Sequence, residues 1–387
     1  MFKAIFTLLP FLFFSLLMFL FVAPARMRVR AQAAWAMALL ACASKFACYK
    51  AFGGDAFAPE LPEKLIWTWN WAYSGMCLLL AMALLWRIAR WVILAGPPRG
   101  RWKTVWLVGL PVVAWGAAAV GVWNGIKVPE VREVVVDFPN LPESLDGYRI
   151  LHMTDFHASA AARRWRTEAI VERANAAGAD LICLTGDYAD GMSDLQAKNL
   201  EPLKGLTARD GVLAVTGNHE YYFDTYGWMR QFHRWGIDFL VNECAFPRPG
   251  LAVAGVSDSQ SAVEGFTKPD PDTAFEAATN GEFRVLLQHR PFVDYERLYG
   301  WPMSEKCDLQ LSGHTHGGVA PGLSWLVRAV NNGMARGLYR RGDGRVVHVS
   351  PGVGQWAGFP IRFFDDPEMT LLVLRRARLT RWTSSFH

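Results

Sequence analysis

The chain has 387 residues, of which 52% are hydrophobic and 19% charged, and it contains 17 Trp and 24 Phe. This composition excludes a disordered or low-complexity chain, and the length is sufficient for two or three structural units. The net charge of +5 is unevenly distributed along the chain. Residues 1–127 carry 13 Lys/Arg and 3 Asp/Glu, whereas residues 128–387 carry 27 Lys/Arg and 32 Asp/Glu. The later part lacks the basic surface that nucleic-acid binding requires, so we expect no nucleic-acid partner.

The first third of the chain contains four apolar stretches close to the roughly 20 residues that a membrane-crossing helix needs. We therefore predict an all-α transmembrane region over residues 1–127. Its helices are expected at residues 4–22, 32–49, 65–86 and 104–126.

Two points in this region allow a second interpretation. The first stretch ends in Ala-Pro-Ala, as a cleaved signal peptide can, but its length and the three stretches that follow favour a retained helix. The second stretch is interrupted by Lys45, which either snorkels to the membrane interface, the interpretation we favour, or is a functional charge inside the membrane.

The loops between the predicted helices differ in charge. Eight Lys/Arg lie in the first and third loops, whereas the two lysines of the second loop are offset by three acidic residues. Short loops rich in Lys and Arg stay in the cytoplasm, so four crossings place both termini outside. We expect the C-terminal domain on the periplasmic or extracellular side. The basic residues are Arg26, Arg28, Arg30, Arg87, Arg90, Arg99, Arg101 and Lys103.

The remainder of the chain has the pattern of an α/β domain. Residues 128–148, rich in Pro and charge, are expected to form a linker, and from residue 149 short apolar runs alternate with helix-like stretches up to residue 387. Strands are predicted at residues 149–153, 180–185, 211–215, 251–256, 283–288 and 309–311. Helices are predicted at 164–177 and 224–235, and a hairpin at 338–341 and 345–349 around Gly-Asp-Gly.

Five of these strands end in Asp, Asn or His. Ligand sites of α/β folds lie beyond the carboxyl ends of the strands, and carboxylate, amide and imidazole donors without Cys suit a dinuclear Mn, Fe or Zn centre rather than a structural zinc. The blocks are Asp155-Phe156-His157, Gly186-Asp187-Tyr188-Ala189-Asp190, Gly217-Asn218-His219-Glu220, His289-Arg290-Pro291 and Gly313-His314-Thr315-His316.

This ordered series resembles the signature of the calcineurin-like metallophosphoesterase family: Asp-x-His, Gly-Asp-x-x-Asp, Gly-Asn-His-Asp/Glu, a lone His and Gly-His-x-His. The resemblance extends to an expected last strand near residues 370–374, and the Gly-Gly after the last block is similar to the membrane-anchored bacterial branch. It implies a β-sandwich flanked by helices, in αββα layers, after the transmembrane helices. It also implies an integral protein of the bacterial inner membrane.

The family's ligand pattern can be transferred to this chain residue by residue. One divalent metal ion would be bound by Asp155, His157, Asp187 and His316, and a second by Asp187, Asn218, His289 and His314. Mn²⁺ is the expected ion, with Fe and Zn as alternatives. The resemblance places His219 over the substrate to assist the leaving group, with Asp190 fixing its tautomer. Alternatively, His219 supports the metal site and Asp190 caps the next helix.

The resemblance implies hydrolysis of a phosphoester by a hydroxide whose pKa the two ions lower. Whether the substrate is a monoester or a diester is left open, because the family handles many phosphoesters with the same ligands. Four helices exceed what an anchor needs, which favours a lipid-linked substrate and contact with membrane lipids. A non-catalytic membrane sensor or scaffold with a vestigial domain is the alternative, and a transporter with an appended enzyme is a weaker one.

Overall fold

The computed structural model describes residues 2–92, 100–291, 307–319, 323–340, 345–356, 358, 360–363 and 365–377. The chain divides into two compact units. The first contains Met1–Lys127, Ser159–Ala162 and Trp356–Phe363, and the second contains Val128–Ala158, Arg163–Gln355 and Phe364–His387.

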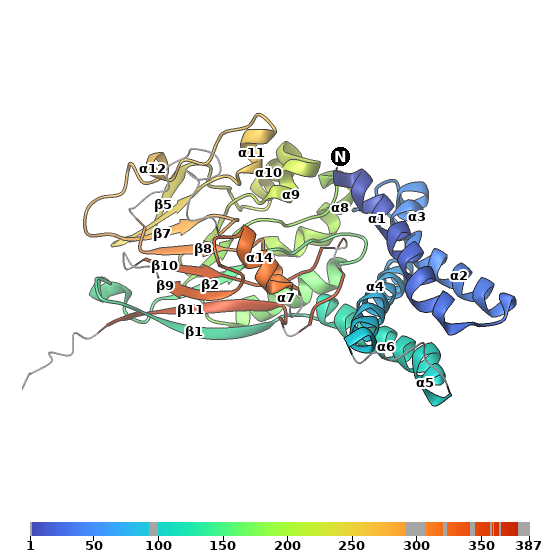
Figure 1. Cartoon of the computed structure of the whole chain (residues 1–387). Helices are drawn as coiled ribbons and strands as arrows, with labels where there is room; N and C mark the ends of the chain where they lie inside the picture. The colour runs from blue at the N-terminus through green and yellow to red at the C-terminus, as the bar shows by residue number, and fades with distance from the viewer. Residues whose placement is uncertain are drawn as a thin grey trace, which may run out of the picture. The chain divides into compact units, whose positions relative to one another are not determined.

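The first unit is helical and is built on long apolar segments (Figure 1). A π-helical turn over Met18–Val22 continues the first helix, and another over Val105–Gly109 joins the last two. The helices are α1 (Phe2–Leu17), α2 (Val29–Ala43), α3 (Lys45–Gly53), α4 (Glu63–Val92), α5 (Arg101–Thr104) and α6 (Leu110–Ile126).

Three stretches of this unit are long and apolar enough to cross a membrane, namely Thr7–Ala25, Glu63–Val92 and Arg101–Ile126. Helices α2 and α3 are bent by 54° and supply a fourth span if the pair crosses as one. The bend falls at Ser44, immediately before Lys45, whose side chain the sequence predicts to snorkel to the membrane interface. Instead its side chain is fully buried, with the ammonium 5.0 Å from the ring centroid of Tyr73, so a cation–π contact holds the charge inside the unit.

The two later segments of the first unit pack against its helices. Trp67 Nε1 donates a hydrogen bond to the carbonyl oxygen of Ala161 at 2.9 Å. The ring of Trp356 lies 5.3 Å from that of Phe57, centroid to centroid. Residues far along the chain therefore complete the packing of the helical unit.

The second unit contains two sheets, with strand orders β1-β11-β2-β3-β4 and β5-β6-β7-β8-β10-β9. Strands β2, β3 and β4 run parallel, as do β6, β7, β8 and β10, so their carboxyl ends share an edge within each sheet. The strands are β1 (Glu130–Phe138), β2 (Arg149–Met153), β3 (Leu181–Leu184), β4 (Val212–Ala214), β5 (Glu243–Arg248), β6 (Leu251–Gly255), β7 (Phe283–Leu287), β8 (Leu309–Ser312), β9 (Gly337–Arg340), β10 (Val346–Val349) and β11 (Glu368–Arg376).

Alternating side chains of the strands build the layers of this unit. Leu181 and Cys183 face the core between the two sheets, whereas Ile182 and Leu184 face the core beneath the helices. Helices α7, α8 and α10 cover that outer face, and α12 packs on the outer face of the second sheet. The expected αββα sandwich is thus confirmed. The helices are α7 (Arg164–Ala176), α8 (Ser193–Leu200), α9 (Asn218–Phe223), α10 (Thr225–Arg234), α11 (Gln260–Val263), α12 (Pro271–Ala274) and α14 (Ser324–Val330).

The structure differs from the sequence-based expectation in the stretch over residues 128–148. The expected linker contains strand β1, which pairs in parallel with β11 over nine residues, from Glu130 opposite Glu368 to Phe138 opposite Arg376. The β-branched run Val134–Val136 favours this strand, and the charged residues around it are tolerated because the strand lies at a sheet edge. The other predicted strands and the hairpin are confirmed to within about two residues, although the hairpin turn lies outside the described residues.

Candidate metal centre

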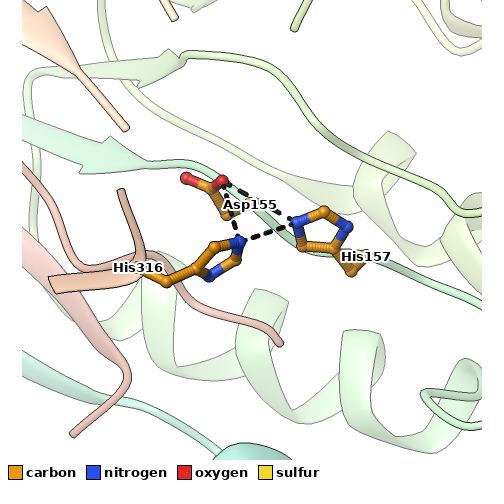
Figure 2. Close-up of side chains that lie close together, drawn as sticks. All are labelled: Asp155, His157 and His316. Atoms are coloured by element: carbon orange, nitrogen blue, oxygen red, sulfur yellow. Dashed lines mark hydrogen bonds and ion pairs between the residues drawn. The ribbon is translucent and has the colours of Figure 1, made fainter. Parts of the chain in front are cut away.

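The first group of ligand atoms joins loops from two sheets. Asp155 and His157 follow β2, and His316 follows β8. Figure 2 shows the three side chains converging. His157 Nε2 lies 3.1 Å from His316 Nε2, and Asp155 Oδ1 lies 3.5 Å from His316 Nε2 and 3.8 Å from His157 Nε2. This spacing leaves the three atoms facing one point, as ligands of one cation do.

A second group is centred on Asp187, which follows β3. Its ligand atom and those of His289 and His314 all lie within 4.8 Å of one another. Asp187 Oδ2 is 3.1 Å from His289 Nε2, and it is also 3.9 Å from the Nε2 atoms of His157 and His219. Asp187 therefore lies between the two groups.

Several buried atoms of these groups have no hydrogen-bond partner among the described residues. They include Asp155 Oδ1, Asn218 Oδ1 and His289 Nε2. Leaving buried polar atoms unpaired costs about 1–3 kcal/mol each, and a bound cation would satisfy atoms that are all electron-pair donors. The residues present thus fit a pair of divalent metal ions.

Asp190 contacts two imidazoles at once. Its Oδ1 atom accepts hydrogen bonds from the Nδ1 atoms of His157, at 2.9 Å, and His219, at 2.7 Å. Protonation of both rings at Nδ1 leaves the Nε2 atoms available as lone-pair donors or proton carriers. Asp190 was expected to orient His219 alone, and its contact with His157 was not foreseen.

Backbone strain is concentrated in the same loops. Left-handed φ values between 46° and 69° occur at five of the candidate residues, although such values are uncommon outside glycine. Strained residues persist only where the surrounding structure determines them, and they are frequent at functional sites. The five are Asp155, His157, Asp187, His314 and His316.

Two glycines allow the loops to approach one another. A Cβ atom on Gly217 would lie 2.2 Å from Asp187 Oδ1, and one on Gly313 would lie 2.3 Å from Asp155 Oδ2. Neither position has room for a side chain, which explains why glycine precedes a candidate ligand in both blocks.

Ligands of a cation must be ionised carboxylates or neutral imidazoles, and the electrostatics meet this condition for part of the centre. Burial acts to lower the pKa of His157 and His289, but neighbouring carboxylates outweigh it and raise both, to about 10 for His289. Burial acts to raise the pKa of Asp155, but the nearby His316 and His157 hold it below its usual value. Burial also acts to raise the pKa of Asp187, but the imidazoles of His289, His219 and His157 together lower it below its usual value. Burial and the positive charge of Arg290 lower the pKa of His314, which stays neutral.

Glu220 is a supporting residue that the sequence analysis left without a role. Its carboxylate accepts backbone N–H bonds from Asp187 at 3.0 Å, Tyr188 at 2.8 Å and Gly217 at 2.7 Å. These bonds fix the backbone of the loop that carries Asp187. Burial and the charge of Asp187 raise the pKa of Glu220 to about 7. The signal was present, because Glu three residues after Gly217 has the spacing of a helix-capping pair.

A further supporting network involves residues that no motif identifies. The carbonyl oxygen of Thr185 accepts a hydrogen bond from His289 Nδ1 at 2.6 Å. The hydroxyl of Thr185 contacts His152 Nε2 at 2.7 Å, and His152 Nδ1 contacts His348 Nδ1 at 2.9 Å. These residues lie up to 196 positions apart, so no local spacing could reveal the contacts.

Comparison with known proteins identifies the family of the domain that carries this centre. Residues 148–318 match the family described as calcineurin-like phosphoesterase. The chain is 32% identical over 269 residues to a transmembrane protein with metallophosphoesterase domain from Danio rerio, covering 67% of this chain and 60% of the relative. It is 29% identical to the protein of the same description from Bos taurus, with the same coverages, and 29% identical to a Helicobacter pylori metallophosphoesterase, covering 66% of each chain.

The chain spans less than two thirds of the length of each of these relatives. The vertebrate proteins among them mean that the likeness is not limited to bacteria. All three relatives are described as metallophosphoesterases or as containing a metallophosphoesterase domain. Like the two transmembrane relatives, this chain has helices that are long and apolar enough to cross a membrane. Residues 148–318 therefore belong to the calcineurin-like phosphoesterase family, in a chain related to transmembrane proteins that contain this domain.

Proposed function

We propose that the chain is a membrane-bound, metal-dependent phosphoesterase that hydrolyses a phosphoric monoester or diester. The observation that carries this proposal is the position of Asp187, which forms one ligand group with His289 and His314 and another with His157 and His219. Buried electron-pair donors on Asp155, Asn218 and His289 also lack a hydrogen-bond partner among the described residues. Such groups are expensive to bury unless a cation satisfies them.

The proposed ligands of one ion are Asp155, His157, Asp187 and His316, and those of the other are Asp187, Asn218, His289 and His314. Mn²⁺ is the ion that we expect first, and Fe and Zn suit the same donors. When bound, the two ions supply Lewis acidity and activate a water molecule for attack on phosphorus.

The side chains beside the ligands have roles of their own. His219 carries a proton at Nε2 for the departing oxygen, and the hydrogen bond from its Nδ1 to Asp190 holds the ring in orientation. The competing role for His219, support of the metal site alone, is consistent with its 3.9 Å distance from Asp187. The two roles differ in how the loss of His219 should depend on the leaving group.

The proposed orientation rests on the basic loops. If the bent pair α2–α3 crosses the membrane as one span, the loop with Arg26 and the loop with Arg99 fall on the same side. With only three spans these two basic segments would lie on opposite sides, against the preference of Lys and Arg for the cytoplasm. Four spans in a bacterial inner membrane place the catalytic domain in the periplasm or outside the cell.

A lipid-linked phosphoester is the proposed substrate class, because a chain with this many apolar helices stays where such a molecule resides. Soluble phosphoesters remain the alternative, and paired assays distinguish them. The same catalytic residues would serve both.

The proposal is tested on the full chain purified in detergent. Metal is removed with a chelator, Mn²⁺, Fe²⁺ or Zn²⁺ is returned, and hydrolysis of p-nitrophenyl phosphate and bis(p-nitrophenyl) phosphate is followed. We expect two ions per chain and metal-dependent turnover. Asp155→Asn should abolish turnover, whereas Asp272→Asn, which changes an acidic residue of α12 outside the metal groups, should retain it. A folded chain that binds two ions and hydrolyses neither compound would favour the scaffold.

A further inference from the structure

Helix α14 presents apolar side chains that nothing in the described part of the chain covers. None of its residues is buried, and the exposed fractions are 67% for Trp325, 50% for Leu326 and 63% for Val330. Both ends are nevertheless anchored. Ser324 packs so closely on Gly318 that a Cβ there would lie 2.7 Å away, and Met334, shortly after the helix, is buried beside Val347 and Val349.

The charged residues of the segment that contains this helix are all basic. Residues 323–340 contain three arginines and no Asp or Glu. Arg336 is engaged by Asp365 at 2.6 Å, whereas no carboxylate of the described residues pairs with Arg328. An exposed Trp with aliphatic neighbours and an adjacent cation is the composition of segments that lie in the membrane interface.

Only a short connection separates this domain from a candidate membrane-crossing helix. Helix α6, which is long and apolar enough with α5 to cross a membrane, ends at Ile126, and strand β1 begins at Glu130. The three residues between them extend over about 10 Å at most. The domain that contains α14 is therefore tethered directly to a membrane-crossing helix rather than by a long flexible connection.

We propose that α14 is a membrane-contact helix, which places Trp325, Leu326 and Val330 in the interfacial layer of the bilayer and Arg328 among anionic lipid headgroups. The occupant of this surface is the lipid bilayer, and the contact does not depend on catalysis. Because α14 begins eight residues after His316, lipid headgroups would lie beside the loop that carries this candidate ligand.

The test places a fluorescent label on α14 in the full chain, reconstituted into lipid nanodiscs. Leu326→Cys is labelled, and quenching by nitroxide groups on the acyl chains of the lipid is measured. Phe246→Cys is the matched control, since Phe246 is an exposed apolar residue on β5, at the other edge of the six-stranded sheet from β9. The unsubstituted chain, treated identically, gives the background of the six native cysteines.

We expect quenching at position 326 to exceed that at position 246 several-fold. Adding phosphatidylglycerol should increase the difference, and Arg328→Gln should remove that increase while leaving quenching in neutral lipid unchanged. Equal quenching at the two positions would overturn the proposal. So would a label at 326 that is shielded from lipid nitroxide and from aqueous iodide alike, or one that cross-links two copies of the chain, since either result assigns the helix a protein partner.

Discussion

At the scale of single residues, Asp190 connects two tasks. One carboxylate oxygen accepts hydrogen bonds from both His157, a candidate ligand, and His219, the candidate acid. Asp190→Asn should therefore weaken metal binding as well as disturb His219, since an amide cannot accept from both rings with the strength of a charged oxygen.

His219→Ala separates leaving-group assistance from support of the metal site. An alkoxide needs a proton as it departs, and a positioned acid contributes about 10²–10⁴-fold there, whereas a nitrophenolate departs unaided. The variant should lose far more activity toward alkyl phosphoesters than toward nitrophenyl phosphoesters, at near-normal metal content. The measurements are kcat/KM for both substrate types and elemental analysis. Equal losses, or concurrent loss of metal, would assign His219 to the metal site.

Asp187→Asn tests the shared carboxylate. Because Asp187 lies between the two ligand groups, its loss should reduce occupancy at both positions and nearly abolish turnover. His314→Ala, which changes only one group, should cost mainly one ion. Both variants are compared by elemental analysis after dialysis against dilute Mn²⁺. Full occupancy in Asp187→Asn would rule out the bridging role.

At the scale of elements, short loops at strand ends hold the ligands in left-handed backbone conformations, and α9 stabilises them. Glu220 on this helix accepts three N–H bonds from the loops after β3 and β4. The backbone strain at Asp187 is thus offset by a carboxylate that is not itself a candidate ligand.

Glu220→Gln tests this clamp. A glutamine offers one acceptor oxygen, so at least one of the three buried N–H groups loses its partner, at a cost of about 1–3 kcal/mol. We expect a melting temperature lower by about 2–4 °C for each kcal/mol, and weaker metal binding. Glu264→Gln, at an exposed glutamate that contacts the Gln260 side chain, is the control and should leave both quantities unchanged. An unaltered melting temperature in Glu220→Gln would show that the clamp is dispensable.

At the scale of the whole molecule, the position of the basic loops predicts which side of the membrane holds the metal centre. Reporters fused after Val128 should be active when the reporter requires export and silent when it requires the cytoplasm. The physical reason is the retention of the eight Lys/Arg of the first and third loops in the cytoplasm across four crossings. The opposite pattern would place the metal centre in the cytoplasm.

The parts of the molecule that were predictable from sequence are those with a local signal. Strands such as β3 follow from short apolar runs, and the candidate ligands follow from blocks at strand ends. The sequence predicts a linker at strand β1 because β11, the strand that pairs with it, lies more than 200 residues later. Contacts such as His152 with His348, and the second partner of Asp190, join distant positions for the same reason. Lys45 was misjudged because its aromatic surroundings form only when α3 meets α4.

The helical unit contains two segments from much later in the chain, and this has a consequence for biosynthesis. The helices of this unit emerge from the ribosome first. Phe57 can contact Trp356, and the Gly121 carbonyl can accept the 2.9 Å hydrogen bond from the Arg362 amide, only after those later residues have been synthesised. The packing of the helical unit is therefore incomplete until residue 362 has been synthesised. A chain that stopped at residue 127 would therefore lack the contacts that Trp356 and Arg362 make with the helices of this unit.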